Sequence, residues 1–266
     1  MTVTEDIPQR TVNGVAVFSR EEFAQRRFHY EPGEHVLFAG PTQNSGKTTL
    51  AGCLLEYIAT PEFPAYVIVS KPADRATERF GKKLGFRKTP DWPAMPHLGP
   101  KPPGYLIWPD MGNPETATVE AARVARAVLN ERYSAGAKKL TRRNAAEGRK
   151  SNAECMILLD DTVAKSKVLK LDDIMVTHLT MAGGMGIGGW YFVQKPTDAG
   201  RAAIWSYSQS EHAFIFYDKV EDNQKRYGEI GGVSREFIVD TTAQLRRYQC
   251  LYIRRNGPQF CIVDSK

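Results

Sequence analysis

The feature that most constrains the fold is the stretch Val36–Thr49, which reads VLFAGPTQNSGKTT. Four apolar residues precede a polar turn bounded by glycines, and apolar residues then recur at helical spacing. This pattern predicts a strand at Glu34–Ala39, a tight turn and a helix at Lys47–Ala59. A buried strand that runs through a turn straight into a helix is typical of an α/β protein.

The rest of the chain repeats this rhythm of short apolar runs and longer amphipathic stretches. A second long helix is expected at Glu115–Arg132. Further strands are expected at Tyr66–Ser70, Tyr105–Trp108, Cys155–Leu159, Trp190–Val193 and Ala213–Tyr217. We therefore expect a mostly parallel sheet flanked by helices on both faces.

Two regions break the rhythm. Six prolines in Lys82–Pro103 predict an irregular excursion between strands. Near the end of the chain, Arg247–Arg254 and Gln259–Val263 flank the turn signal Asn256-Gly257, which predicts a C-terminal β-hairpin. We expect an N-terminal segment (1–33), a core (34–230) and a C-terminal extension that contains the hairpin (231–266).

The composition excludes several classes of protein. The chain has 266 residues, of which 42% are hydrophobic and 25% charged, so it is neither wholly disordered nor collagen-like. No apolar stretch approaches the roughly 18 residues of a membrane-spanning helix, and the N-terminus lacks the basic-then-apolar order of a signal peptide. We expect a protein without a membrane span that stays in the cytoplasm.

The cysteines and the net charge constrain the protein less. Cys53, Cys155, Cys250 and Cys261 form no CxxC pair and no zinc spacing, which favours buried thiols in a reducing compartment. The formal net charge of +6 permits a polyanionic partner without requiring one.

The turn after the first predicted strand has the composition of a phosphate-binding loop, or P-loop. Such a loop aims backbone N–H groups and a helix N-terminus at phosphate oxygens, with a Lys for the β- and γ-phosphates and a hydroxyl for Mg²⁺. Lys47 and Thr48 supply these two groups. The candidate ATP-binding residues are Gly40, Pro41, Thr42, Gln43, Asn44, Ser45, Gly46, Lys47, Thr48 and Thr49. The spacing is unusual, because five residues separate the two glycines and Pro41 takes the place of the usual first glycine.

A second motif is the apolar run that ends in two carboxylates, Met156–Asp161. A buried strand delivers such carboxylates at its C-terminal edge, beside the P-loop. Asp160 is expected to hold Mg²⁺ together with Thr48, and Asp161 to orient or deprotonate a water. Asp161 is one methylene shorter than the Glu found in many ATPases, and the alternative is that it caps the next helix.

A third element is the strand that ends in Gln194-Lys195-Pro196. A polar side chain at this strand tip would face the γ-phosphate and sense it. Gln194 fits that role, and the alternative is a surface Gln at a strand end.

With these three motifs in this order, the chain resembles the FtsK/HerA superfamily of DNA-pumping P-loop ATPases, and its small size points to the viral genome-packaging branch. The resemblance covers about 32–218 and includes Glu34-His35-Val36 and the Gly186-Ile187 step. It implies a P-loop NTPase fold of the RecA-like, additional-strand type. It further implies a ring of five or six copies that hydrolyses ATP between neighbours and moves double-stranded DNA, with a portal, capsid or membrane-vertex protein as a possible partner.

The chain departs from the family at one functional position. Relatives often carry an Arg just before the Gly-Ile step, where it reaches the neighbouring subunit's site, whereas Met181–Ile187 contains none. Arg201 is the first candidate for this catalytic Arg, followed by Arg142 and Arg143. The alternative for each is an ordinary surface or DNA-facing Arg.

Positive charges gather in two places. Lys138, Lys139, Arg142 and Arg143 precede the Asp160 strand, and Lys165 and Lys167 follow it. Such clusters would neutralise DNA phosphates without reading sequence, and the alternative is a solvated charged face. No helix-turn-helix or zinc pattern supports base-specific recognition.

These observations predict an ATP- and Mg²⁺-dependent ATPase coupled to DNA translocation, best matched by a viral or phage genome-packaging motor. A plasmid or conjugative DNA-transfer ATPase shares the same core. A third possibility is a nucleotide switch with little turnover. DNA-stimulated hydrolysis would separate a motor from a switch.

Overall fold

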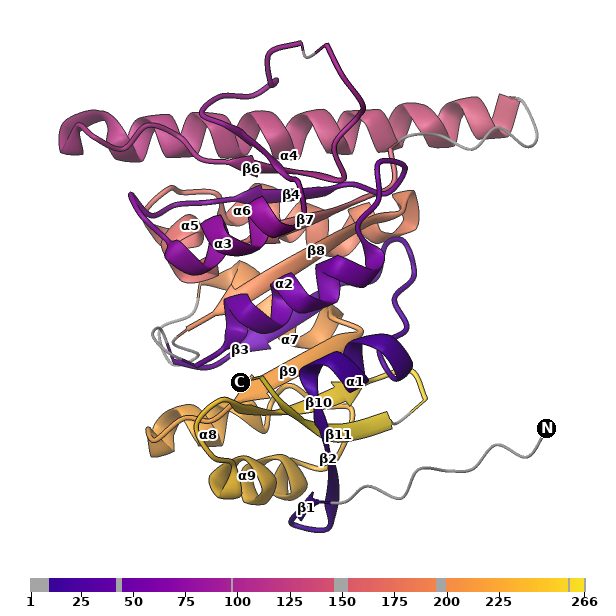
Figure 1. Cartoon of the computed structure of the whole chain (residues 1–266), viewed down its shortest axis with the longest axis vertical. Helices are drawn as coiled ribbons and strands as arrows, with labels where there is room; N and C mark the ends of the chain where they lie inside the picture. Colours follow the sequence, from indigo (N-terminus) through magenta and orange to yellow (C-terminus); the bar gives the residue numbers. More distant parts are fainter. Residues whose placement is uncertain are drawn as a thin grey trace.

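The computed structural model describes residues 10–41, 45–96, 98–145, 153–194, 200–257 and 259–265, with the backbone alone for 140–145. Within these ranges the chain forms an eleven-stranded sheet with helices on both faces (Figure 1). The strands are β1 (Thr11–Val12), β2 (Val15–Ser19), β3 (Val36–Ala39), β4 (Ala65–Ile68), β5 (Arg87–Thr89), β6 (Gly104–Ile107), β7 (Cys155–Leu159), β8 (Ile187–Val193), β9 (His212–Phe216), β10 (Gln249–Arg254) and β11 (Gln259–Asp264).

The helices follow the strands in alternation through most of the chain. They are α1 (Arg20–Arg26), α2 (Lys47–Ile58), α3 (Arg75–Lys83), α4 (Pro114–Ala145), α5 (Thr162–Lys167), α6 (Asp172–Thr177), α7 (Arg201–Gln209), α8 (Glu221–Tyr227) and α9 (Arg235–Gln244). A π-helical turn, η1 (His178–Ala182), and a 3₁₀ turn, η2 (Gly183–Met185), lead into β8.

The sheet is parallel in its centre and mixed at one side. Its strand order is β1-β2-β11-β10-β9-β3-β8-β7-β4-β6-β5, and the seven strands from β9 to β5 run parallel. β10 and β11 form the expected antiparallel hairpin, and β11 continues the sheet to β2. One sheet therefore runs through the N-terminal segment, the core and the C-terminal extension.

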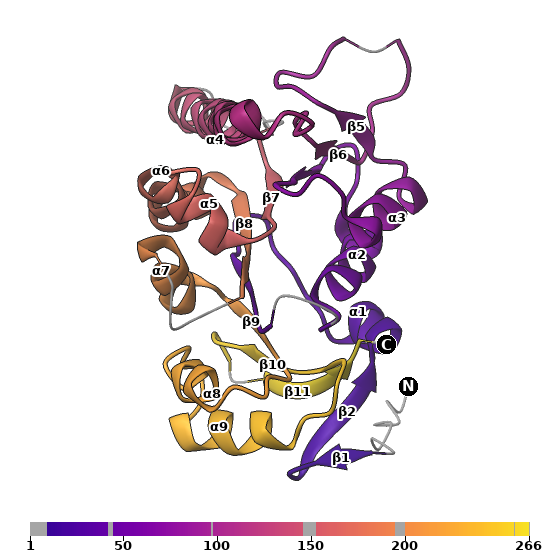
Figure 2. The ribbon, with the colours of Figure 1, turned by 90° about the vertical axis from the view of Figure 1, so that its left-hand side faces the viewer.

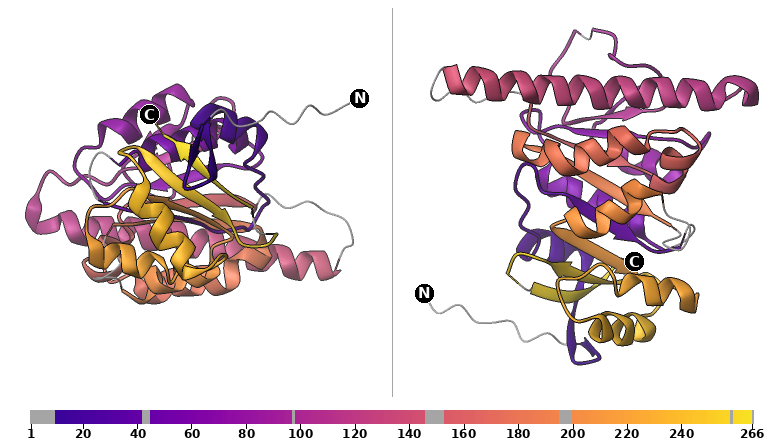
Figure 3. Two further views of the ribbon diagram at one scale, coloured as in Figure 1. Left: turned by 90° about the horizontal axis from the view of Figure 1, so that it is seen from below. Right: turned by 180° about the vertical axis from the view of Figure 1, so that it is seen from behind.

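Two helical layers cover the sheet. α1, α2 and α3 lie on one face and the helices from α4 to α9 on the other (Figure 2). Along β3 the side chains alternate between the two cores: Val36 and Phe38 pack with Leu50 and Leu54 of α2, whereas Leu37 and Ala39 pack on the α7 side. The long α4 crosses the β4–β6 end of the sheet (Figure 3). Every residue of β3, β4, β7, β8 and β9 is buried, as expected for parallel strands covered on both faces.

The six strands and two helices expected in the core are present, with shifts at their ends. β8 is longer than expected because it includes Gly188 and Gly189. A side chain at Gly188 would overlap the Tyr30 hydroxyl and the main-chain oxygen of Glu34. Gly188 is thus explained by a close approach of the chain before β3, whereas a Cβ at Gly189 would overlap the Tyr191 ring.

One expectation of irregular structure was wrong in part. Within Lys82–Pro103, residues Arg87–Thr89 form the edge strand β5, which pairs with β6. Its three polar residues contain no apolar pattern that would predict a strand. They form one because they pair with the edge of β6.

Candidate nucleotide site

The carboxyl ends of the central parallel strands meet at one edge of the sheet. The register places Ala39 opposite Val193, and Leu159 opposite both Tyr191 and Ile68. The P-loop, both carboxylates of the second motif and Gln194 therefore follow neighbouring strands. This edge is where α/β proteins of this type bind their ligands.

The described ends of the P-loop need glycine for steric reasons. Gly40 has a φ of 151°, and a Cβ there would lie 2.7 Å from Cβ of Phe216. Gly46 has a φ of 95°, and a Cβ there would overlap the Ser265 hydroxyl. Thr42, Gln43 and Asn44 lie outside the described residues.

Helix α2 begins directly after Gly46 without a side-chain cap. The N–H groups of its first turn, together with the helix dipole, are therefore available to an anion. Thr48 is partly exposed and Thr49 is exposed on this first turn. The local geometry is that of a phosphate site.

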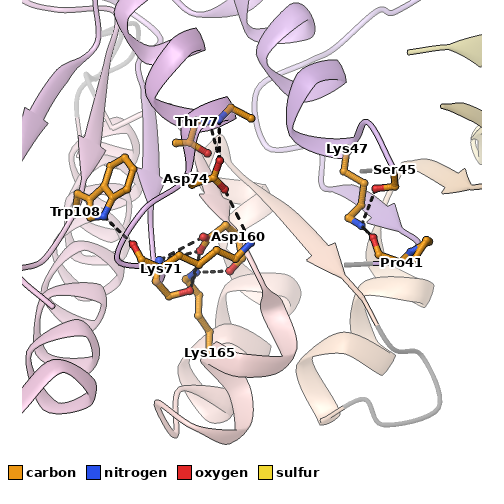
Figure 4. A network of polar contacts seen from close by, with 11 residues as sticks. Pro41, Ser45, Lys47, Lys71, Asp74, Thr77, Trp108, Asp160 and Lys165 are labelled. Atoms are coloured by element: carbon orange, nitrogen blue, oxygen red, sulfur yellow. Dashed lines mark hydrogen bonds and ion pairs between the residues drawn. The ribbon is translucent and has the colours of Figure 1, made fainter. Parts of the chain in front are cut away.

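Lys47 is buried, and its ammonium is held by the loop itself. Nζ donates to the Gly40 oxygen at 2.8 Å, to the Ser45 hydroxyl at 3.1 Å and to the Pro41 oxygen (Figure 4). Burial, and to a smaller extent the charge of Lys71, lowers the pKa of Lys47 to about 7 against the opposing effects of Asp218 and Asp161. Burial disfavours the charged form of Lys47, so a bound anion in place of the loop carbonyls would keep the ammonium charged above about pH 7.

Asp160 lies at the end of β7 in a dense set of donors. Its carboxylate accepts from the Ser70 N–H at 3.1 and 3.3 Å and from the Ser70 hydroxyl at 3.0 Å, and it pairs with the Lys165 ammonium. Trp108 Nε1 donates to the Lys71 oxygen at 2.8 Å in the neighbouring loop. No role was assigned from the sequence to Ser70 or Lys71, which lie at the end of and just after the expected strand Tyr66–Ser70, because the sequence did not show that this strand pairs with β7.

Lys165 is fully buried, which corrects one sequence expectation. Its Nζ bonds to Asp160 and, at 3.1 Å, to the Ser70 hydroxyl. Burial lowers the pKa of Lys165, and Asp160 opposes that shift. A side chain in this position is not accessible to DNA, so the expected DNA contact of Lys165 was wrong for this conformation.

Asp161 has a φ of 47° and is the N-cap of α5, where its carboxylate accepts from the Ala164 N–H at 3.0 Å. The capping role that the sequence left open is therefore present. The same carboxylate acts electrostatically on both Lys47 and Lys165, so it also lies near the P-loop.

Gln194 is buried at the end of β8, next to the point where the Gly40 N–H donates to the Val193 oxygen at 3.0 Å.

Arg201 begins α7 and is exposed. Its guanidinium pairs with Asp172 at 3.0 Å and with Asp173, and these two carboxylates raise its pKa. Arg201 is thus held on the α6 side of the helical layer.

The remaining basic residues expected to contact DNA are spread over two helices. Lys138 on α4 and Lys167 on α5 are exposed, whereas Lys139 is buried and paired with Glu154. Arg142 and Arg143 lie in the last turns of α4, and their side chains are outside the described residues.

A pocket of about 410 Å³ opens beside the P-loop. It is lined by Pro41, Ser45, Tyr217, Asp218, Lys219, Val220, Arg247 and Tyr248. The Arg247 guanidinium lies 4.9 Å from the ring centre of Tyr248, a cation–π contact. Six of these residues come from the segments after β9 and before β10, which the sequence analysis did not connect with the loop.

Solved structures with a similar architecture include a DNA-packaging ATPase, a conjugation coupling protein and a protein with two ATPase domains. The DNA-packaging ATPase B204 of Sulfolobus turreted icosahedral virus is 14% identical over 88% of this chain and 98% of that protein, with a TM-score of 0.53. The conjugation coupling protein TcpA of pCW3 is 14% identical over 88% of this chain and 61% of its own (TM-score 0.55). The ATPase domains 2 and 3 of EssC from Geobacillus thermodenitrificans are 10% identical over 90% of this chain and 41% of their own (TM-score 0.54).

The chain has the fold of a P-loop ATPase. The fold class expected from the sequence is confirmed, as is the resemblance to genome-packaging and FtsK/HerA-type ATPases at the level of fold. No protein-family profile matches the chain, and no curated protein matches its sequence.

The oxygen ligands at this edge of the sheet are suited to Mg²⁺ that is also bound to a nucleotide. The described residues contain no cluster of three or more His, Cys, Asp or Glu that could enclose a metal. Mg²⁺ in such sites is held by one or two side chains and by substrate phosphates. The hydroxyl of Thr48 and the carboxylate of Asp160 are oxygen donors of the right kind, so the residues present fit the ion.

Proposed function

We propose that the protein binds ATP with Mg²⁺ at the P-loop and hydrolyses it to move double-stranded DNA, as the genome-packaging motor of a virus or phage. The observation that carries this proposal is the buried Lys47 of an uncapped helix start, at the same sheet edge as Asp160, Asp161 and Gln194. Support for the DNA substrate comes from the similar architecture of B204, which is a DNA-packaging ATPase.

Lys47 and Asp160 would act through groups that the structure already positions. Lys47 would exchange the Gly40 and Pro41 carbonyls for β- and γ-phosphate oxygens, and the first turn of α2 would add backbone donors. The other P-loop residues, Thr42 to Ser45 and Thr49 among them, would line the phosphates. Thr48 and Asp160 would hold Mg²⁺, which neutralises charge on the phosphates when it is bound.

The attacking water and the γ-phosphate would be served by the neighbouring strand ends. Asp161 would polarise the water while it caps α5, and Gln194 would sense the γ-phosphate from β8. The nucleoside would occupy the pocket between the P-loop and Tyr248. B204 of Sulfolobus turreted icosahedral virus 2 has been solved with AMPPCP and with ATP-γS, which supports ATP as the nucleotide.

A ring of five or six copies would complete the site with an Arg from a neighbour. Arg201 is the first candidate because it is exposed and charged, and Arg142 and Arg143 follow. Lys138 and Lys167 are exposed cations that would contact DNA phosphates, with Arg142 and Arg143 on the same helix as Lys138. Among the described residues, none of the helices could cross a bilayer by length and apolarity. We place the motor in the host cytoplasm, docked on a portal or capsid-vertex protein.

The test is the steady-state ATPase rate of the purified protein with and without long double-stranded DNA. DNA should stimulate the rate, and Lys47→Ala should abolish both the basal and the stimulated activity. An unchanged rate in Lys47→Ala would overturn the assignment of the P-loop.

The second candidate is a nucleotide switch with little turnover. Two contacts favour it: Asp161 caps a helix, and Asp160 is paired with Lys165. A switch would bind ATP but show neither turnover nor a response to DNA. A conjugative DNA-transfer ATPase would behave as the motor does in this assay and would be distinguished by the DNA it transfers.

A further inference from the structure

Lys165 lies at the proposed site but has no part in the proposed chemistry. Its side chain is fully buried, and its ammonium contacts Asp160 through both the side chain and the main-chain oxygen. Burying an ammonium is unfavourable unless it is paired and hydrogen-bonded. A Lys165 held in this way occupies the cation position at the carboxylate expected to hold Mg²⁺ (Figure 4).

The two oxygens of Asp160 are unequally engaged. Oδ1 accepts from the Ser70 N–H at 3.1 Å, from the Ser70 hydroxyl at 3.0 Å and from Lys165 Nζ. Among the residues that the structure describes, Oδ2 accepts only a longer contact, 3.3 Å from the same Ser70 N–H. Lys165 and Ser70 therefore fix the carboxylate by one oxygen and leave the other with capacity for a further donor or a metal-bound water.

The ammonium also changes the charge that an incoming metal meets. The Lys165 ammonium contacts Oδ1 of Asp160 directly, so it offsets the negative charge of this carboxylate and repels an incoming cation. A divalent metal competes with Lys165 for the Asp160 carboxylate. Free metal would bind there to a carboxylate whose charge Lys165 already offsets, whereas metal bound to a nucleotide keeps phosphate oxygens as further ligands.

We propose that Lys165 is a positioning residue that makes metal binding at Asp160 depend on a bound nucleotide. The inference rests on the proposed function, because it takes Asp160 as the metal carboxylate of a nucleotide site. Lys165 holds Oδ1 in the nucleotide-free protein and prevents Mg²⁺ from occupying the site alone. The dependence on nucleotide would keep the site from being blocked by free metal between catalytic cycles.

The experiment uses Mn²⁺ as the probe metal and measures free Mn²⁺ by electron paramagnetic resonance. The full-length protein is titrated without nucleotide and with a non-hydrolysable ATP analogue. In the wild type the analogue should raise Mn²⁺ affinity strongly. Lys165→Met keeps an unbranched side chain but removes the charge that repels the metal, and it should raise nucleotide-free Mn²⁺ affinity by about tenfold or more.

Two further variants separate this role from a structural one. Lys165→Arg keeps the charge and should keep nucleotide-free binding weak. Adding Asp160→Asn to Lys165→Met should abolish the gain in Mn²⁺ affinity, because the gain belongs to that carboxylate. Loss of packing alone would lower thermal stability without changing the ratio of the two Mn²⁺ affinities.

Two outcomes would overturn the inference. One is a folded Lys165→Met whose nucleotide-free Mn²⁺ affinity equals that of the wild type. The other needs no variant: a wild-type protein that binds Mn²⁺ equally well with and without the analogue. Binding of a fluorescent ATP analogue in EDTA is measured separately, and its absence would count against the proposed function, not against the Lys165 comparison.

Discussion

The Ser265 hydroxyl fills the space beside Gly46 in which a Cβ of that residue would lie, so that the segment after β11 lies against the end of the P-loop. Ser265 is itself fixed, because its N–H and its hydroxyl both donate to the Tyr248 oxygen, at 2.7 and 2.6 Å. The hairpin of the C-terminal extension therefore supports the P-loop and places Tyr248 beside it. The described P-loop geometry depends on residues more than two hundred positions away in the sequence.

Gly46→Ala should lower both stability and nucleotide affinity. Ala at a φ of 95° is strained by about 1–2 kcal/mol, and its Cβ would in addition overlap Ser265. Gly85→Ala is the matched control, since Gly85 has a φ of 68° but open space around its Cβ. Urea unfolding and binding of a fluorescent ATP analogue measure the two effects.

The overlap can be tested apart from the backbone strain. Ser265→Gly should recover part of the loss in Gly46→Ala, because it removes the overlapping side chain. Equal losses in Gly46→Ala and Gly85→Ala, with no recovery by Ser265→Gly, would show that the contact between Gly46 and Ser265 has no effect on the P-loop.

Acid should destabilise the protein through buried His35. Its Nδ1 accepts from the Gly189 N–H at 2.9 Å, and burial lowers its pKa from 6.5 to about 4. In the unfolded chain His35 therefore binds a proton below about pH 6.5, whereas in the folded chain it binds one only below about pH 4. The free energy of unfolding therefore falls as the pH falls through this window. Between about pH 7 and pH 5, His35 should account for a loss of about 2 kcal/mol.

His35→Asn keeps an acceptor near Gly189 but cannot titrate. It should lower stability at neutral pH and make the fall between neutral and acid pH shallower than in the wild type, with the exposed His29→Asn as the control. The free energy of unfolding in urea at the two pH values provides the measurement. Identical pH dependence in His35→Asn and wild type would show that His35 does not carry the proton linkage. Buried His178, whose pKa burial also lowers to about 4, would keep part of the slope in every variant.

The sequence was sufficient for the core of the sheet because its strands are fully buried. Continuous apolar runs such as Cys155–Leu159 leave little choice of structure, and the glycines and Lys47 that follow β3 identify the phosphate loop locally. The strand ends then meet at one edge by the geometry of a parallel sheet. Asp160 and Gln194 could be placed near the P-loop for that reason alone.

The parts that could not be predicted depend on contacts between distant segments. In the sequence, Lys165 looks like one of several surface cations. In the structure, α5 turns its side chain inward and the segment after β4 supplies Ser70 as its partner. Likewise, β2 is a short run whose position is decided by β11 at the other end of the chain. The pocket beside the P-loop combines residues from three segments, and nothing local marks Tyr248 as one of them.

Arg247→Ala should weaken nucleotide binding if the nucleoside occupies this pocket. The guanidinium lies over the Tyr248 ring and lines the pocket, where it would also contact an aromatic base. A cation–π contact of this kind with the bound base is worth about 0.5–1 kcal/mol at an exposed site. The expected result is a decrease in ATP-analogue affinity of about two- to fivefold. Its neighbour Arg246 is exposed and is not part of the pocket, so Arg246→Ala is the control. Equal affinities in the two variants would place the nucleoside elsewhere.

Arg201→Ala should abolish hydrolysis without changing the fold, if Arg201 acts on a neighbouring subunit. Its side chain is 64% exposed, so its removal should leave the melting temperature near that of the wild type. An Arg supplied in trans stabilises the charge of the transferring phosphoryl group, and its loss lowers kcat by about a thousandfold or more. Arg123→Ala, which removes another exposed and ion-paired Arg, should leave kcat unchanged.

Mixing subunits decides whether Arg201 acts in cis or in trans. Lys47→Ala subunits lack a functional P-loop but carry Arg201, and Arg201→Ala subunits have the reverse defect. If the Arg acts across an interface, mixtures of the two inactive proteins should recover part of the ATPase rate, because some interfaces then combine an intact P-loop with an intact Arg. Two outcomes would count against Arg201 as the trans Arg. One is a mixture that stays inactive although native mass spectrometry shows mixed oligomers, and the other is an Arg201→Ala protein with normal kcat. Arg142 and Arg143 on α4 would then be tested by the same mixing experiment.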